Sequence, residues 1–207
     1  MEFGQDIPAD VLTQAVESVL RGDILLYPTD TVYGIGGDAA RDDVTRRIRD
    51  LKGVEADKPL LVLTDSWDRV EDWIPKPDGL VRRLMALATF HSITILFPAA
   101  ECVPRTLIGS SEEIGIRLCR HPFCIDLIRK ASRPISSTSA NPTGEAVPLS
   151  IREVDDRIRL GVDLVVDGGS LPGAPSTIVR PEGDRPFVLR EGSISEAALA
   201  RLLEGQF

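Results

Sequence analysis

The sequence predicts a single α/β domain, because short apolar runs that suit strands alternate with segments whose apolar residues recur at helical spacing. The chain has 207 residues, of which 43% are hydrophobic and 27% charged, a composition ordinary for a globular domain with an apolar core. No internal repeat, low-complexity tract or linker divides the sequence. We therefore expect one domain over residues 1–207.

The first elements surround the stretch that organises the chain. Residues 8–21 carry apolar side chains at helical spacing, and Gly22 is the expected end of this helix. Residues 24–27 are predicted to form a buried strand, which the following proline ends. Residues 28–37 are rich in threonine and glycine and predict a polar, flexible turn before a basic helix at residues 41–52. Such strand ends hold ligands in many α/β proteins, and an ordinary connecting loop is the alternative.

The rest of the chain continues the alternation. A short helix is expected to end at Trp73, with Asp65 or Ser66 as its cap and its tryptophans in the core. Pro122 suits the first turn of a later helix. Helices are predicted at residues 80–88, 122–131 and 194–203, and strands at residues 60–63, 93–97, 114–118, 164–166, 177–179 and 187–189.

Composition limits the classes of function. No apolar run approaches the roughly 18 residues of a membrane span, and the acidic N-terminus lacks the pattern of a signal peptide, so we expect a cytoplasmic protein without a membrane segment. Cys102, Cys119 and Cys124 lack C-x-x-C spacing and are expected to be reduced thiols in the core. His91 and His121 lack metal-ligand spacing, so no protein metal site is predicted.

Known catalytic and nucleotide-binding signatures are absent or weak. The sequence has no G-x-S-x-G elbow and no Walker A lysine, which weighs against a serine hydrolase and a P-loop. Residues 34–39 fit the loose G-x-G-x-x-A fingerprint, but six residues separate the first glycine from the strand, which weighs against a dehydrogenase. A nucleotide would have to be held in another way.

A run of hydroxyl side chains is the second distinctive feature. Residues 136–141 read Ser-Ser-Thr-Ser-Ala-Asn and come after an apolar lead-in. Hydroxyl and amide groups suit phosphate or carboxylate oxygens. An ordinary strand followed by an Asn-Pro turn is the alternative interpretation.

Net charge is −8, which argues against a protein that coats nucleic acid with its whole surface. Basic residues crowd residues 41–58, but acidic residues are interleaved with them. This stretch is either a solvated helix face with paired charges or one wall of a local basic cleft.

Six segments in the same order resemble the YrdC-like family, and the match covers nearly the whole chain. They are PTDTVYGIGG at residues 28–37, LKGVEADKPLLVL at 51–63, GIRLCRHP at 115–122, STSAN at 137–141, PSTIV at 175–179 and VLREG at 188–192. The resemblance implies a twisted mixed β-sheet flanked by helices with a deep, positively charged cavity. Because the sequence ends at Phe207, the extra C-terminal domain of longer members is not expected.

The resemblance also implies an activity. Members with known activity are threonylcarbamoyladenylate synthases, which convert L-threonine, bicarbonate and ATP into threonylcarbamoyl-AMP and pyrophosphate for threonylcarbamoyladenosine formation in tRNA. ATP is then a substrate, with Mg²⁺ carried by its phosphates. Further partners that the resemblance implies are tRNA or double-stranded RNA and proteins of the tRNA modification pathway.

Site residues carry over from the resemblance position by position. No covalent protein nucleophile is needed, because the protein has to orient two anions and neutralise charge. The catalytic residues implied are Lys52, Ser139 and Asn141. The ATP-binding residues implied are Lys52, Lys58, Arg117, Ser137, Ser139, Asn141 and Arg190, and the threonine-binding residues are Thr31, Arg117 and Ser176.

Two departures from the family pattern leave an alternative open. The family's K-x-R reads Lys52-Gly53-Val54 here, and its P-G-P-x-T turn reads Phe-His-Ser-Ile-Thr at residues 90–94. The alternative is a paralogue resembling the YciO branch that binds nucleotide or double-stranded RNA with little synthase activity.

Overall fold

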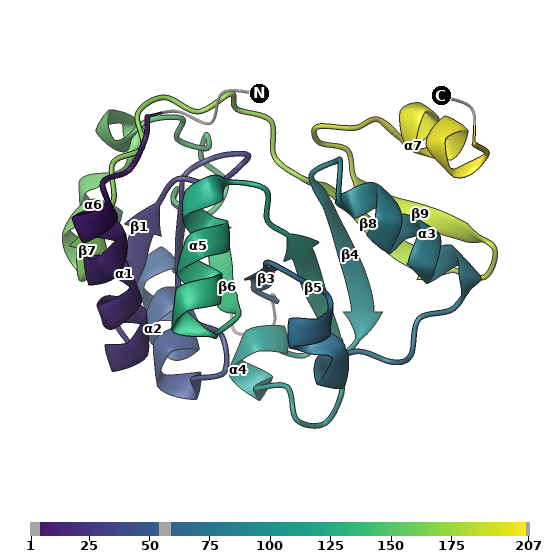
Figure 1. Ribbon diagram of the computed structural model, residues 1–207, viewed down its shortest axis with the longest axis horizontal. Coiled ribbons are helices and arrows are strands. Elements are labelled where there is room, and N and C mark those ends of the chain that lie inside the picture. The colour runs from purple at the N-terminus through teal and green to yellow at the C-terminus, as the bar shows by residue number, and fades with distance from the viewer. Residues whose placement is uncertain (1–4, 54–58, 206–207) are drawn as a thin grey trace.

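A mixed β-sheet forms the centre of the computed structural model, which describes residues 5–53 and 59–205 (Figure 1). The strands are β1 (Leu25–Tyr27), β2 (Gly34–Asp38), β3 (Leu61–Thr64), β4 (Ile93–Pro98), β5 (Glu113–Leu118), β6 (Ile135–Ser139), β7 (Leu164–Val165), β8 (Thr177–Glu182) and β9 (Arg185–Arg190). The helices are α1 (Ala9–Arg21), α2 (Asp42–Lys52), α3 (Gly79–Ala88), α4 (Arg105–Ile108), α5 (Pro122–Ala131), α6 (Asp156–Gly161) and α7 (Glu196–Leu203), with 3₁₀ helices η1 (Asp68–Trp73) and η2 (Ile151–Glu153).

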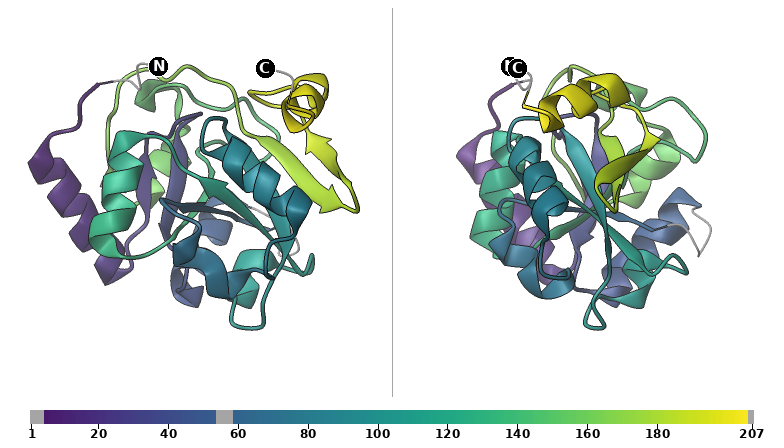
Figure 2. Two further views of the ribbon diagram at one scale, coloured as in Figure 1. Left: turned by 45° about the vertical axis from the view of Figure 1, so that its right-hand side comes forward. Right: turned by 90° about the vertical axis from the view of Figure 1, so that its right-hand side faces the viewer.

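The strand order across the described sheet is β7-β1-β2-β6-β3-β5-β4-β8-β9. β1 with β7, β3 with β5 and β4 with β8 run parallel, while the other neighbouring strands are antiparallel. Two further views show the twist of the sheet and the helices on either side of it (Figure 2). The twisted mixed sheet flanked by helices is therefore confirmed.

Two apolar clusters attach the helices to the sheet. In the first, Val19 of α1 and Leu127 of α5 pack with Leu25 and Leu63, so these two helices cover the β1 end of one face. The second cluster is larger and includes side chains from α2, α3 and α7, which pack with strand residues such as Ile95. Each cluster removes apolar surface from water, which is the main favourable contribution to folding.

The predicted helix boundaries hold where glycine or proline marks them. Gly22 adopts φ 93° after α1, and its amide donates to the carbonyl oxygens of Ser18 and Val19, both at 3.1 Å. This left-handed cap is the geometry that glycine favours at a helix C-terminus. Pro122 occupies the first turn of α5, where its missing amide proton costs nothing.

A polar turn was predicted for residues 28–37. Residues 28–33 do form a loop, but the prediction is wrong for the glycine-rich residues that follow. Residues 34–38 form the fully buried strand β2, which pairs with β1 on one side and β6 on the other. A Cβ atom on Gly36 would lie 1.9 Å from the Ser136 carbonyl oxygen, so only glycine fits this approach of β6. Glycine here serves close strand packing rather than a turn.

Smaller differences concern the short helix and one cysteine. η1 begins after Trp67 without a side-chain cap, because Asp65 instead pairs with Arg69 at 2.6 Å. Trp67 is only partly buried and packs edge-on against Phe97, with ring centroids 6.2 Å apart. The remaining tryptophan, in η1, is also partly buried. Cys102 is exposed rather than in the core, whereas Cys119 and Cys124 are buried. All three cysteines are free thiols.

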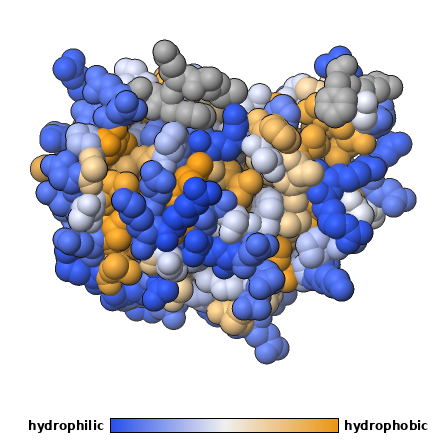
Figure 3. Space-filling view, viewed as in Figure 1, coloured by the Kyte–Doolittle hydropathy of each residue, from blue (hydrophilic) through white to orange (hydrophobic). Residues whose placement is uncertain are grey.

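Hydrophilic residues cover most of the face shown in Figure 3, and hydrophobic residues gather in patches between them. None of the helices in residues 5–53 and 59–205 has both the length and the apolar character needed to cross a membrane. Several of the described charges form ion pairs at the surface, which contribute little stability individually.

Candidate active site

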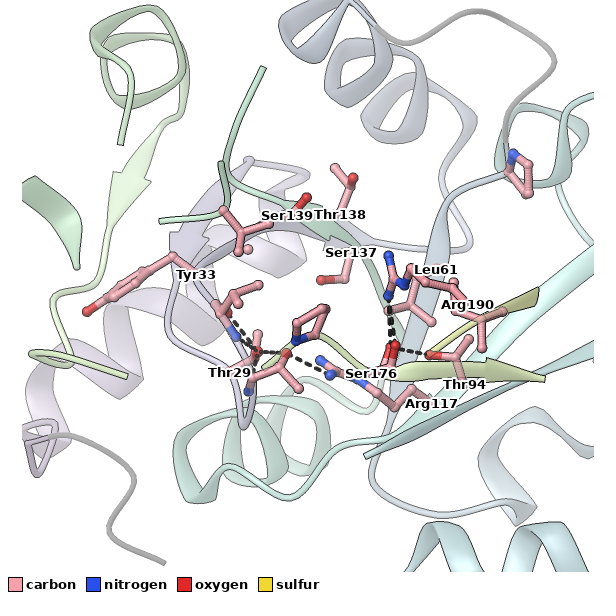
Figure 4. Close-up of a pocket in the computed structure, with 17 residues that line it drawn as sticks. Thr29, Tyr33, Leu61, Thr94, Arg117, Ser137, Thr138, Ser139, Ser176 and Arg190 are labelled. Carbon is pink, nitrogen blue, oxygen red and sulfur yellow. Dashed lines mark hydrogen bonds between the residues drawn. The ribbon is translucent and has the colours of Figure 1, made fainter. Parts of the chain in front are cut away.

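A cavity of about 210 Å³ opens on the same sheet face that α5 covers at its other end. Along β3, Leu63 packs under α5, while Leu61, two residues earlier, lines the cavity. The loop after β1 and the ends of β6, β8 and β9 supply most of the remaining wall (Figure 4). The cavity therefore begins where the helical cover of this face stops.

Small residues of β2 and β6 form the floor of the cavity. Gly34 pairs with Ser139, and Gly36 pairs with Ser137, so glycines and serines alternate across β2 and β6 on this face. A Cβ on Gly34 would lie 3.1 Å from the Ser137 hydroxyl, tighter than an ordinary contact. Ser136 points to the other face and donates to the Gly37 carbonyl oxygen at 3.1 Å. The hydroxyl run is thus a strand that presents alternate serines to the cavity.

Arg117 lies in the cavity wall and is 97% buried. Its Nη1 donates to Thr31 Oγ1 at 2.8 Å, and its Nη2 lies 3.5 Å from Asp30 Oδ1. Burial would lower the pKa of the guanidinium, but nearby negative charge, chiefly that of Asp30, raises the pKa above its usual value. Arg117 is therefore a fixed cation beside the Thr31 hydroxyl.

A second guanidinium borders the same cavity. Arg190 Nη2 donates to the Ser176 carbonyl oxygen at 2.9 Å, and the Ser176 hydroxyl shares a 2.8 Å hydrogen bond with Thr94 Oγ1 (Figure 4). Burial and the positive charge of Arg117 both lower the pKa of Arg190. No carboxylate is among the described residues that line the cavity. An anion bound here would relieve the repulsion between the two guanidiniums.

Lys52, Ser139 and Asn141 form a connected group at one side of the cavity. Lys52 Nζ donates to the Ser139 carbonyl oxygen at 2.5 Å, to Ser139 Oγ at 3.0 Å and to Asn141 Oδ1 at 3.4 Å. Asn141 Nδ2 donates to the Glu145 carbonyl oxygen at 2.6 Å, which turns its Oδ1 toward the lysine. Burial lowers the pKa of Lys52 to about 8. Among the described residues, the ammonium has only neutral acceptors, so it would gain from a nearby anion.

The structure brings most of the residues implied by the family resemblance to one place. Lys52 and Asn141 do not line the cavity themselves. Lys52 hydrogen-bonds to Asn141 and to Ser139, which does line it. Lys58 and Val54 lie outside the described residues. Those that line the cavity are Thr31, Arg117, Ser137, Ser139, Ser176 and Arg190.

Sequence reasoning missed Thr29, Thr94 and the ion pair of Asp30. Thr29 Oγ1 and Thr31 Oγ1 share a 2.9 Å hydrogen bond, and Thr94 is the cross-strand partner of Arg117. Period-two alternation puts Thr94 on one face of its strand, but only the register shows that Arg117 lies beside it.

Several basic residues at the start of α2 and within it are engaged in ion pairs or hydrogen bonds. Arg41 pairs with Asp43 at 2.6 Å, and Arg47 pairs with Asp163 at 2.9 Å. Arg49 is buried and donates to the Thr106 carbonyl oxygen. These contacts agree with the paired-charge interpretation of this helix. Nowhere in the described residues do three or more His, Cys, Asp or Glu side chains gather so that they could hold a metal ion.

Comparison with known proteins identifies the family to which the chain belongs. The matching family model is Sua5_yciO_yrdC, described as "Telomere recombination", and it covers residues 17–192. A Pyrococcus abyssi protein named threonylcarbamoyl-AMP synthase is 29% identical over 177 residues, which is 85% of this chain and 52% of that protein. A Bacillus subtilis protein of the same name is matched over 56% of its length, so the chain spans about half the length of these relatives.

Two solved structures share the fold. The crystal structure of P. abyssi Sua5 complexed with L-threonine has a TM-score of 0.85 and 27% identity, covering 95% of this chain and 58% of that one. Escherichia coli YciO has a TM-score of 0.81 and 27% identity, covering 91% of this chain and 92% of that one. With a family model that matches most of the sequence, the chain belongs to the Sua5/YciO/YrdC family.

Proposed function

We propose that the protein is an ATP-dependent threonylcarbamoyl-AMP synthase. It would convert L-threonine, bicarbonate and ATP into threonylcarbamoyl-AMP and pyrophosphate, for the threonylcarbamoyladenosine modification of tRNA. The observation that carries the proposal is a hydroxyl-lined cavity with two guanidiniums, Arg117 and Arg190, and no carboxylate among its described lining residues. Such a cavity suits a small polar anion next to a second, larger anion.

The two arginines suit the amino acid. Arg117 and Arg190 would neutralise the carboxylate of L-threonine, and the hydroxyls of Thr31 and Ser176 would accept or donate hydrogen bonds beside it. Support comes from P. abyssi Sua5, whose crystal structure was obtained with L-threonine and which shares this fold. The absence of a carboxylate in the described lining fits an amino group that has lost its positive charge as a carbamate.

The lysine group suits the nucleotide. Lys52 would donate to phosphate oxygens of ATP, with Ser137, Ser139 and Asn141 as neutral partners and Lys58 as a second cation. Phosphate charge would raise the Lys52 pKa from its lowered value and hold the lysine as an ammonium. Mg²⁺ would arrive on the phosphates, because the described lining offers it no carboxylate ligand.

The chemistry then needs positioning more than proton transfer. Bicarbonate takes up a proton and loses water to give CO₂. Threonine nitrogen bonds to the carbon of this CO₂ and loses a proton, and an oxygen of the resulting carbamate attacks the α-phosphorus of ATP. The bond from the α-phosphorus to the bridging oxygen breaks, and pyrophosphate leaves. Arg117, Arg190 and Lys52 would hold two anions close together against their mutual repulsion, which is the main contribution a protein can make to such a displacement.

Several broader features belong to the same proposal. We propose that residues 1–207 form one catalytic domain, which acts in the cytoplasm with partner proteins of the tRNA modification pathway. Binding of tRNA or double-stranded RNA would depend on a local basic patch, because the chain carries a net charge of −8. Affinity for duplex RNA in a filter-binding assay would then fall steeply as salt is added, and affinity that ignores salt would contradict RNA binding of this kind.

A YciO-like role is the second candidate, because YciO matches this chain over 92% of its own length and Val54 stands where the family pattern has arginine. In that role the protein would bind a nucleotide or double-stranded RNA with little synthase activity. Release of pyrophosphate separates the two candidates. A synthase releases pyrophosphate only when L-threonine, bicarbonate and ATP are all present. A binding protein with little synthase activity releases little pyrophosphate even with all three.

A further inference from the structure

A buried carboxylate behind the cavity fixes the orientation of Arg117. Asp30 has a side chain with 0% exposure and is absent from the lining of the cavity, so it cannot itself contact a ligand there. Its Oδ1 lies 3.5 Å from Arg117 Nη2, too far for a good hydrogen bond but close enough for a strong charge interaction in a buried setting.

The carboxylate itself is held by two neighbours. Ser92 Oγ donates to Asp30 Oδ2 at 2.6 Å, and Cys119 Sγ donates weakly to Asp30 Oδ1 at 3.4 Å. Burial opposes the ionisation of Asp30, yet the charge of Arg117 and these hydrogen bonds hold its pKa below the usual value. Asp30 is thus an anion whose oxygens have fixed directions.

The other side of the guanidinium is fixed by the residue next to Asp30. Arg117 Nη1 donates to Thr31 Oγ1 at 2.8 Å, and Thr31 Oγ1 in turn bonds to Thr29 Oγ1. The Thr29 hydroxyl gives its proton to the Val32 carbonyl oxygen at 2.8 Å, so Thr31 is the donor in the bond between the two threonines. One loop therefore holds Arg117 at two of its nitrogen atoms.

We propose that Asp30 is a positioning residue that sets the direction of the Arg117 guanidinium and that Ser92 holds the Asp30 carboxylate in place. Ser92 lies immediately before β4, within the segment that departs from the family's turn sequence. Its carbonyl oxygen accepts from Thr177 N at 3.1 Å, which ties the same residue to β8 at the far wall of the cavity. Ser92 therefore connects Asp30, which holds Arg117, to strand β8, which pairs with the strand that carries Arg190.

Ser92→Ala is the primary variant, because it removes the hydroxyl and keeps every charge. Asp30→Asn would leave the buried Arg117 guanidinium without its carboxylate and could fail to fold. Ser92→Thr retains a hydroxyl and serves as the rescue variant. Ser136→Ala is the matched control, since it removes an equally buried serine hydroxyl whose partner is the Gly37 carbonyl oxygen on the opposite sheet face.

This inference rests on the proposed function for its ligand, so the first readout is L-threonine affinity by calorimetry on the full chain. Ser92→Ala should weaken binding about three- to tenfold, whereas Ser92→Thr and Ser136→Ala should stay within about twofold of wild type. In an Arg117→Lys background, Ser92→Ala should have no further effect, because its influence passes through the guanidinium. Unchanged affinity in Ser92→Ala, or an equal loss in both backgrounds, would overturn the proposal.

A second readout is independent of the ligand. Nitrogen-15 NMR of the arginine side chains reports rotation of a guanidinium, and Arg117 should give separate Nη signals in wild type that merge in Ser92→Ala but not in Ser136→Ala. Identical Arg117 signals in wild type and Ser92→Ala would overturn the positioning role. If wild type does not bind L-threonine, the proposed function fails, and this NMR comparison still decides whether Asp30 and Ser92 position Arg117.

Discussion

The ammonium group of Lys52 lies 3.0 Å from the hydroxyl of Ser139 and 2.5 Å from the Ser139 carbonyl oxygen. This pair ties the last residue of α2 to the last residue of β6, two elements separated by more than eighty positions in the sequence. In the part of the chain that the structure describes, the hydrogen-bond acceptors of the lysine are three neutral oxygen atoms, and none of them is a carboxylate. An anionic ligand at this point would supply a negative charge.

Binding of ATP should depend on the protonation of Lys52. Burial lowers the pKa of Lys52 to about 8, so a growing fraction of the free protein carries a neutral amine above that pH. We expect the dissociation constant for ATP, measured by calorimetry, to rise as pH increases through 8 in wild type. Lys52→Arg keeps a permanent charge and should bind with little pH dependence over the same range. A wild-type profile as flat as that of Lys52→Arg would contradict the lowered pKa.

The same lysine has a consequence for stability. Its pKa in the folded chain lies below the ordinary value of 10.5, so between pH 8 and 10.5 the unfolded chain binds more protons. Stability should therefore rise across this window in wild type relative to Lys52→Gln, because the cost of burying the ammonium disappears as it deprotonates. Urea denaturation of both proteins on either side of the window measures the difference. A difference in unfolding free energy that does not change with pH would exclude this interpretation.

Ser139→Ala and Asn141→Ala test the nucleotide side of the site. Each variant removes one polar group that would contact ATP, a contact worth about 1.5 to 3 kcal/mol when one partner is charged, while Lys52 keeps its bond to the Ser139 carbonyl oxygen. We expect weaker ATP binding or slower turnover with a melting temperature close to that of wild type. Ser136→Ala, on the opposite face of the same strand, should bind ATP normally. ATP affinities equal to wild type in both test variants would remove these residues from the nucleotide site.

Gly36→Ala tests the close approach of β2 and β6. The added methyl group would meet the Ser136 carbonyl oxygen at 1.9 Å and the Tyr27 hydroxyl at 2.9 Å, so backbone has to move. We expect a loss of about 1 to 3 kcal/mol or more in the free energy of unfolding. Gly79→Ala is the matched control, because a Cβ there meets no atom within 4 Å. Equal stability of the two variants in chemical denaturation would show that β2 does not need glycine.

The sequence alone predicts the longer helices α1, α2, α3, α5 and α7 well, because their signals are local, whereas the short helices α4 and α6 were not predicted. Apolar spacing with Gly22 after α1 and Pro122 in α5 places both helices correctly. Strand β2 was not predicted, because glycine has no side chain that could show the alternation of a strand. Gly36 is needed there because the backbone of Ser136 in β6 lies so close to it. A turn and a tightly packed strand look the same in such a sequence.

Within the site, resemblance supplies the residue types and the structure supplies their partners. Arg117 is implied by the family pattern, but its hydrogen bond to Thr31 joins residues 86 positions apart. The bond from Ser92 to Asp30 spans 62 positions and involves a serine that no motif marks. Contacts of this kind depend on strand order and register, which local periodicity does not contain.

Val54→Arg tests the departure from the family's K-x-R sequence. Val54 lies outside the described residues, so this prediction rests on the family pattern alone. One preorganised donor at a site of developing charge is worth on the order of a hundred- to a thousandfold in rate. Restoring the arginine should raise pyrophosphate release about tenfold or more in a weakened synthase. If wild type is already fast and Val54→Arg is neutral or harmful, another cation fills this role.

The central claim is that the hydroxyl-lined cavity with Arg117 and Arg190 joins threonine, bicarbonate and ATP in one adenylate. A single-turnover reaction with carbon-13 bicarbonate, followed by mass identification of the product, tests it most directly. The account predicts threonylcarbamoyl-AMP that carries the label, formed by wild type and strongly reduced in Arg117→Ala. ATP bound without any labelled adenylate, under conditions where all three substrates are saturating, would contradict the account and favour the nucleotide-binding alternative.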